Sequence, residues 1–273
     1  MEGKTIKQDT RKKAVFFDID GTLIDAAHGQ PFLTPVVKKA LRELRQQGHY
    51  IFIATGRPYA FLNEEIRSFG FDGFVLMNGA AVLLGNEVIY SQAMEDRLVQ
   101  PICDTCEKHG IEYVLNGIHH AYLSAAAGRL RNFYEDFHID TQNFVTEFDR
   151  HQTLTYKMEF LAGDEAGASL YDSFLSEELA SMQDPFHRMN LELYSSRETK
   201  GTGILHALQH LEIPVERSFA FGDGSNDFEM IETVGTGLVM GNAGDALKAR
   251  GDRLVPSVHE DGVAAGIRDY ILD

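Results

Sequence analysis

The sequence has little cysteine and no long apolar run, and each of these shortages excludes a class of protein. Two cysteines among 273 residues cannot form a structural zinc site alone or a disulfide framework. No apolar run approaches the about 20 residues that span a bilayer, and the first residues are polar rather than those of a signal peptide. We therefore expect a protein of the reducing cytoplasm without a membrane partner, with residues 1–12 as a flexible tail.

Positive charge is also scarce. The chain has 25 Lys and Arg against 41 Asp and Glu, for a formal net charge of -16. Non-specific binding of nucleic acid is driven by basic residues on phosphates, so this balance argues against nucleic acid as a partner. An anionic substrate would have to be attracted locally, by a metal ion or by a few placed cations.

The two cysteines, Cys103 and Cys106, stand three positions apart. This spacing occurs in redox motifs, which normally follow a strand. Here it falls inside an expected helix over 93–109, which favours two thiols that pack in a helix interface.

Strand and helix patterns alternate along the chain, which predicts an α/β fold with a parallel sheet. The segment 85–194 differs, because it carries 19 acidic and 7 basic residues and its strands lack the Asp- and Gly-rich ends found elsewhere. We predict a core domain of 1–84 and 195–273 and an inserted α/β domain of 85–194; one continuous sheet is the alternative. The expected helices include 59–69, 127–137 and 164–181.

The most informative segment is the run from Ala14 to Leu23. Four apolar residues predict a strand buried on both faces, and Asp18, Asp20 and Gly21 follow it. Ligands of open parallel sheets bind beyond this end of the strands. Two ionised carboxylates so close together repel each other, which indicates a cation or a chemical task. The alternative is a solvated Asp-Gly turn.

Other predicted strands also end in polar groups. Thr55 follows the strand over 50–54, and Asp223 and Asp227 follow the strand over 218–221. Because parallel strands end at the same edge of a sheet, we expect these groups to gather near Asp18 and Asp20. Four carboxylates there require a cation, and oxygen ligands favour Mg²⁺.

This set of residues suits phosphoryl transfer. One Asp can attack phosphorus, and a second Asp two residues later can protonate the leaving oxygen and then activate water. A threonine hydroxyl and a lysine, Thr55 and Lys200, can stabilise charge on the phosphoryl oxygens. Glycines such as Gly56 let the backbone approach a phosphate closely.

In this order the motifs resemble those of the haloacid dehalogenase (HAD) superfamily, in the Cof-type branch of phosphatases. The four motifs are DIDGTL at 18–23, ATGR at 54–57, Lys200, and GDGSND at 222–227. The resemblance implies a Rossmann-like parallel-sheet core with an α/β cap inserted between the second and third motifs, where 85–194 lies.

The resemblance also implies roles for the residues that match these motifs. Asp18 would be the nucleophile and a Mg²⁺ ligand, and Asp20 the general acid and base, which binds the metal through its backbone carbonyl. Asp223 would bind the metal directly, and Asp227 would hold the metal's waters or Lys200. The phosphoryl group would be bound by Thr55, Gly56, Lys200 and Asn226, with a helix cap as the alternative role for Asn226.

Three further positions are less directly tied to the motifs. Arg57 and Asn78, at neighbouring strand ends, are candidates for contact with the substrate or the cap, and a structural role is the alternative. Arg197 competes with Lys200 for the cationic role, but Gly201 and the start of a helical pattern favour Lys200.

The function we expect is Mg²⁺-dependent hydrolysis of a small phosphomonoester, such as a sugar phosphate or a nucleotide-like cofactor, through an aspartyl-phosphate. The alternatives are a phosphosugar mutase on the same core and a non-catalytic phosphate-binding regulator. The protein is expected to act as a monomer or homodimer.

Overall fold

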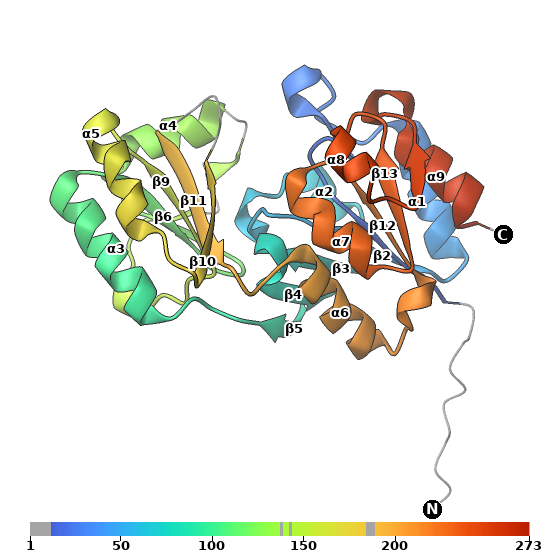
Figure 1. The fold of residues 1–273 in the computed structure, drawn as a ribbon, viewed down its shortest axis with the longest axis horizontal. Coiled ribbons are helices and arrows are strands. Elements are labelled where there is room, and N and C mark those ends of the chain that lie inside the picture. Colours follow the sequence, from blue (N-terminus) through green and yellow to red (C-terminus); the bar gives the residue numbers. More distant parts are fainter. Residues whose placement is uncertain (1–11, 137–138, 142–143, 184–188, 273) are drawn as a thin grey trace, which may run out of the picture. The chain divides into compact units, whose positions relative to one another are not determined.

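The computed structural model describes residues 12–136, 139–141, 144–183 and 189–272 (Figure 1). The density of contacts divides the chain into two compact units, residues 1–52 with 208–273 and residues 53–207. The predicted inserted domain, 85–194, lies within the second unit, and its boundaries stay a prediction. The predicted tail lies almost wholly outside the described residues.

The larger sheet has eight strands in the order β14-β13-β12-β1-β2-β3-β4-β5. Strand β1 pairs in parallel with β12, β12 with β13, and β13 with β14, as the alternating pattern predicted. Its strands are β1 (Ala14–Phe17), β2 (Tyr50–Ala54), β3 (Gly73–Leu76), β4 (Ala81–Leu84), β5 (Glu87–Ser91), β12 (Ser218–Gly222), β13 (Thr236–Met240) and β14 (Arg253–Val255).

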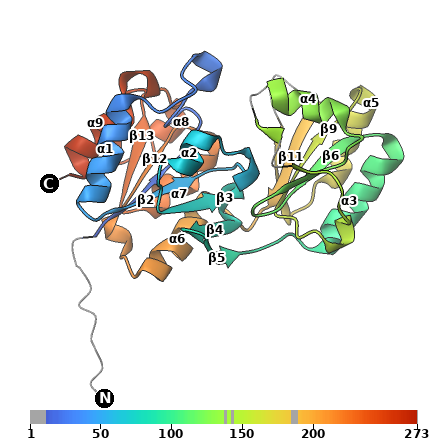
Figure 2. The ribbon, with the colours of Figure 1, turned by 180° about the vertical axis from the view of Figure 1, so that it is seen from behind.

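The first unit has helices on both faces of its strands. Helices α1 (Pro35–Gln46) and α9 (Gly262–Tyr270) lie together on one face, and α7 (Phe228–Thr233) lies on the other (Figures 1 and 2). Helix α1 begins where the Thr34 hydroxyl accepts a hydrogen bond from the Val37 amide at 3.1 Å, with Pro35 as its first residue. The short helix α8 (Asp245–Lys248) precedes β14.

The second unit contains a six-stranded sheet in the order β10-β11-β9-β6-β7-β8. Its strands are β6 (Glu112–Asn116), β7 (Ala121–Leu123), β8 (Phe144–Val145), β9 (Lys157–Leu161), β10 (Leu179–Gln183) and β11 (Asn190–Ser195). The helices of this unit are α2 (Glu64–Ser68), α3 (Asp96–His109), α4 (Gly128–Asp136), α5 (Glu165–Ala168) and α6 (Lys200–Leu211), the last of which ends in the first unit.

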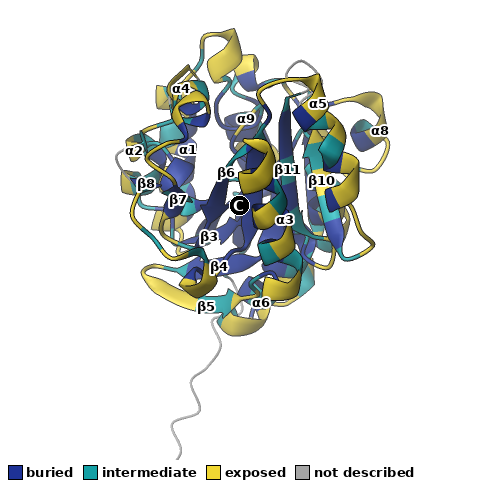
Figure 3. Cartoon of the chain, turned by 90° about the vertical axis from the view of Figure 1, so that its left-hand side faces the viewer, coloured by how far each residue is buried: buried dark blue, intermediate teal, exposed yellow. Residues whose placement is uncertain are grey.

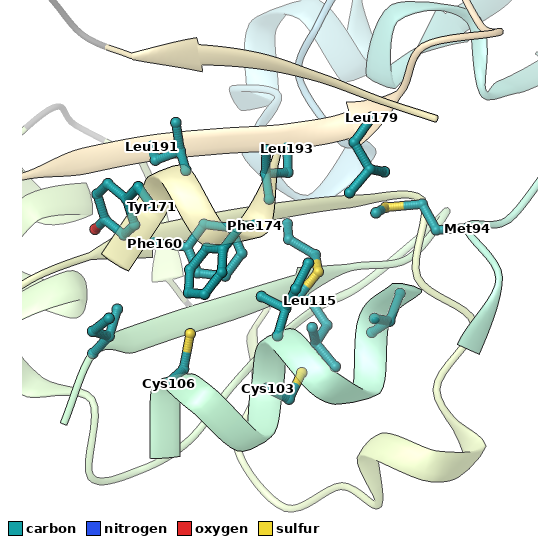
Figure 4. Close-up of a cluster of buried hydrophobic side chains, with 14 of the residues drawn as sticks. Met94, Cys103, Cys106, Leu115, Phe160, Tyr171, Phe174, Leu179, Leu191 and Leu193 are labelled. Carbon is teal, nitrogen blue, oxygen red and sulfur yellow. The ribbon is translucent and has the colours of Figure 1, made fainter. Parts of the chain in front are cut away.

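One face of the six-stranded sheet is covered by α3 and the segment that follows α5 (Figure 4). Cys103 and Cys106 are free and buried in this cluster, next to side chains such as Phe160. Burial raises the pKa of the Cys103 thiol to about 11, so little reactive thiolate exists at neutral pH. The thiols therefore pack the interior of this cluster.

Two predicted helices are wrong as single elements. The segment 59–69 forms a 3₁₀ turn (Tyr59–Phe61) and then α2. The Asn63 side chain accepts a hydrogen bond from the Ile66 amide and so caps the start of a new helix. The segment 164–181 forms α5, a 3₁₀ helix (Ser169–Phe174) and the start of β10, which pairs with β11. In the second case pairing between strands outweighs local helical spacing.

Burial follows this architecture (Figure 3): the strands are largely buried and the helices turn one face outward. Within the described residues, none of the helices combines the length and apolar character that a bilayer crossing requires.

Candidate active site

The first motif begins at the end of β1, where Asp18 is fixed by the sheet. Its amide donates to the Phe221 carbonyl at 3.0 Å, which continues the pairing of β1 with β12. The Asp18 side chain is buried, whereas Asp20 is exposed. Between Asp20 and Ile24 the chain makes a tight turn, in which Gly21 has a φ of +84°.

Three carboxylates of the first unit gather at this end of the strands. Ligand oxygens of Asp18, Asp223 and Asp227 all lie within 4.8 Å of one another. Carboxylate oxygens are ligands that Mg²⁺ takes in proteins, so this donor set fits the ion in its chemistry. Three buried or half-buried carboxylates at such a distance repel one another strongly without a cation. The Asp20 carboxylate is not part of this group.

Asp223 is held by two residues for which the sequence analysis predicted no role. The Thr22 hydroxyl donates to its Oδ1 at 2.9 Å, and Asn242 Nδ2 donates to its Oδ2 at 3.2 Å. Asn242 also donates to the Gly21 carbonyl at 2.8 Å. A Cβ on Gly21 would lie 2.1 Å from Asp223 Oδ2, so only glycine allows this approach.

A signal for both residues is present in the sequence. Thr22 belongs to the first motif, and Asn242 is the second residue after the buried strand β13, in a polar turn of the kind that holds Asp18 after β1. The rule that polar residues after buried strands are candidates would have included Asn242.

Asp227 shapes the loop that carries Asp223. Its Oδ2 accepts hydrogen bonds from the amides of Asp223 and Gly224, both at 2.9 Å. The side chain is fully buried, and Asn226 lies half-buried in the same turn. Asp227 therefore stabilises the loop directly, and it is also one of the three carboxylates of the group.

The second motif forms a hydrogen-bonded turn after β2, in the second unit. The Thr55 amide donates to the Val75 carbonyl oxygen at 2.8 Å, and the Asn78 amide donates to the Thr55 carbonyl oxygen at 3.1 Å. The Arg57 amide donates to the Thr55 hydroxyl oxygen at 3.1 Å. The structure thus brings Thr55, Arg57 and Asn78 together, at the ends of β2 and β3.

Lys200 is the first residue of α6 and is fully buried. Arg197, the competing cation, has a side chain that is 75% exposed and lies 4.0 Å from Glu178, which favours Lys200 for a role in a pocket. The start of α6 is seated against the turn after β3, since a Cβ on Gly79 would lie 2.0 Å from the Thr199 carbonyl oxygen. The convergence of Thr55 and Lys200 on the carboxylate group stays a prediction.

A family model of haloacid dehalogenase-like hydrolases matches residues 15–267 of the chain. The chain belongs to this family. The motifs that predicted the family, at 18–23, 54–57, 200 and 222–227, all lie within the matched segment.

Two relatives of this HAD hydrolase are similar to it over nearly their whole length. YkrA of Bacillus subtilis strain 168, which carries a provisional phosphatase name, is 29% identical over 268 residues, covering 95% of this chain and 98% of YkrA. The 5-amino-6-(5-phospho-D-ribitylamino)uracil phosphatase YitU of the same organism is 28% identical over 275 residues, covering 96% and 98%.

Solved structures of other proteins are also similar to this chain. A sugar phosphatase of HAD subclass IIB is 28% identical with a TM-score of 0.76, covering 94% of this chain and 98% of that one. A protein from Geobacillus kaustophilus is 28% identical with a TM-score of 0.82 over the same shares. The resemblance to the Cof-type branch is confirmed, and the chain is a phosphatase-type hydrolase that acts on phosphate esters.

Proposed function

We propose that this HAD hydrolase removes the phosphoryl group from a small phosphorylated metabolite in a Mg²⁺-dependent reaction with Asp18 as the nucleophile. The observation that carries the proposal is the group of Asp18, Asp223 and Asp227 beyond the ends of β1 and β12. A metabolite rather than a nucleic acid as substrate is consistent with the net charge of -16. A cytoplasmic site of action is consistent with two free cysteines.

Mg²⁺ would be held by carboxylate oxygens of Asp18 and Asp223 and by the backbone carbonyl of Asp20, with Asp227 next to them. When bound, the ion neutralises charge on the phosphoryl oxygens and on the attacking carboxylate. Thr22 and Asn242 keep the Asp223 carboxylate oriented for this task, because they occupy one lone pair on each of its oxygens.

The residues divide the chemistry between them. An oxygen of Asp18 attacks phosphorus, and Asp20 gives its proton to the oxygen of the departing alcohol. Asp20 then takes a proton from the water that attacks the aspartyl-phosphate, which releases phosphate and restores Asp18. The exposed position of Asp20 suits a group that must exchange protons with substrate and water.

The phosphoryl oxygens would be bound by Thr55, Gly56, Lys200 and Asn226. Residues 85–194 would form the cap that selects the leaving group, with Arg57 and Asn78 as candidates for contacts to it. Sugar phosphates and nucleotide-like phosphates are the proposed substrate class, which is supported by the named substrates of the two phosphatases described above.

The test is phosphate release from p-nitrophenyl phosphate and from a panel of sugar phosphates and nucleotide-like phosphates. The wild-type protein should need Mg²⁺ and be inhibited by EDTA. Asp18→Asn should lower kcat by about a thousandfold or more, because loss of a nucleophile removes the covalent route. Asp96→Asn, on the exposed start of α3, is the matched control and should retain full activity. Normal turnover by Asp18→Asn would contradict the proposal.

A further inference from the structure

A buried lysine in the six-stranded sheet has no role in the chemistry described above. Lys157, the first residue of β9, is 3% exposed. Its Nζ lies 3.2 Å from Glu159 Oε1 and 2.6 Å from Glu192 Oε2. Burial opposes the charge on Lys157, but the two carboxylates outweigh it and raise its pKa, so the side chain is an ammonium ion. Such a buried cluster is seldom the most stabilising choice for an interior, which suggests that it has a specific task.

The third hydrogen bond of the ammonium group leaves the sheet. Lys157 Nζ donates to the carbonyl oxygen of Gly56 at 3.2 Å. An ammonium group has three donors, and the two carboxylates and this carbonyl account for all of them. Lys157 therefore connects the six-stranded sheet to the second motif, ATGR.

The bond to Gly56 fixes the orientation of a whole peptide group. The Gly56 carbonyl and the Arg57 N–H belong to the same planar peptide unit, so holding one holds the other. The Arg57 N–H donates to Thr55 Oγ1 at 3.1 Å. Rotation of this peptide away from Lys157 would break the hydrogen bond to the Thr55 hydroxyl.

That hydrogen bond determines what the Thr55 hydroxyl can do. A hydroxyl has one donor and two acceptor positions, and here Arg57 occupies an acceptor position. Thr55 as a whole residue is 2% exposed, and its hydroxyl proton has no acceptor among the residues that the structure describes. The hydroxyl is thus left as a donor for a ligand oxygen.

We infer that Lys157 is a positioning residue for phosphoryl transfer: it holds the Gly56–Arg57 peptide so that the Thr55 hydroxyl donates to the phosphoryl group. The inference rests on the proposed function, in which Thr55 binds that group.

The surroundings of Lys157 show how a flexible side chain is kept in one place. Glu159 is itself held, since its two oxygens accept hydrogen bonds from Asn116 Nδ2 at 3.1 Å and from the Tyr134 hydroxyl at 2.8 Å. Asn116 and Tyr134 are both buried. The carboxylate that pairs with Lys157 is therefore fixed, and the ammonium group is fixed with it.

The experiment is a double-mutant cycle on kcat/KM for p-nitrophenyl phosphate. Thr55→Val removes the donor and should lower kcat/KM by about a hundredfold. Lys157→Met should lower it by about tenfold to a hundredfold, because a misplaced group loses much of its effect. The double variant should be within about threefold of Thr55→Val, since both changes remove the same interaction. Multiplied losses in the double variant would overturn the inference.

One further variant separates the hydrogen bond from the charge, and a second variant serves as its control. Lys157→Met combined with Glu159→Gln and Glu192→Gln leaves no unpaired buried carboxylate and should still show the loss seen in Lys157→Met. Recovery of wild-type kcat/KM in this triple variant would overturn the inference. Lys108→Met, at the exposed end of α3, is the matched control and should keep wild-type activity.

A crystal structure of the triple variant separates this inference from the proposed function, because it needs no activity. The Gly56–Arg57 peptide should be rotated, with Arg57 N no longer bonded to Thr55 Oγ1. An unchanged peptide would overturn the inference even if the protein is an active phosphatase. A wild-type protein that releases no phosphate from any substrate would overturn both.

Discussion

Asp223 shows that the geometry of this site depends on the residues that hydrogen-bond to a carboxylate as well as on the carboxylates themselves. One of its oxygens accepts a hydrogen bond from Thr22 and the other from Asn242. Both bonds orient the carboxylate before any ion binds. The four motifs identified the acidic residues in the sequence, but contacts between side chains from distant segments follow only from the fold.

Asn242→Ala is predicted to weaken Mg²⁺ binding by about tenfold to a hundredfold, the usual effect of removing a partner that orients a ligand. Calorimetric titration of the metal-free protein with Mg²⁺ measures this directly. Asn86→Ala, in the exposed turn between β4 and β5, should leave the affinity unchanged. An affinity unchanged in Asn242→Ala would mean that Asp223 needs no such support.

At the scale of elements, the sequence predicted strands better than it predicted helix boundaries. Buried strands such as β1 and β12 are short runs of mostly apolar residues, and few other structures fit such a run. The helix predicted over 164–181 contains apolar residues at helical spacing, yet its last part pairs with β11. The contact between Gly56 and Lys157 joins residues 101 positions apart, and no local pattern indicates it.

The turn after β3 is the element whose backbone conformation is most demanding. Met77 and Asn78 have φ of +50° and +54°, and Gly79 has +99°. Residues other than glycine are costly in this left-handed region, so the surrounding structure must stabilise the turn. The turn places Gly79 against Thr199, one residue before Lys200.

Gly79→Ala is therefore predicted to destabilise the protein by at least about 2 kcal/mol, because it adds a steric clash to the backbone strain of about 1–2 kcal/mol. Gly85→Ala is the matched control: Gly85 also has a positive φ, of +58°, but a Cβ there would meet nothing within 4 Å. Urea unfolding of the two variants measures the difference. Equal destabilisation would show that the approach to Thr199 carries no constraint.

At the scale of the whole molecule, the family followed from four short motifs and their order, and the match over 15–267 confirms it. The substrate did not follow, because none of the four motifs lies in 85–194, the predicted cap to which we assign the selection of the leaving group. The acidic balance of that segment favours small substrates over polyanions but does not specify one.

The proposed reaction requires that Asp18 is phosphorylated during turnover. The direct measurement is a rapid-quench experiment on Asp20→Asn with p-nitrophenyl phosphate labelled in its phosphoryl group. The p-nitrophenolate group can leave without a proton from Asp20, whereas attack of water on the intermediate is slowed. Peptide mapping of the quenched protein should place the covalent label on Asp18, and Asp18→Asn should carry none. Label on a different residue, or turnover without any covalent label, would contradict the account.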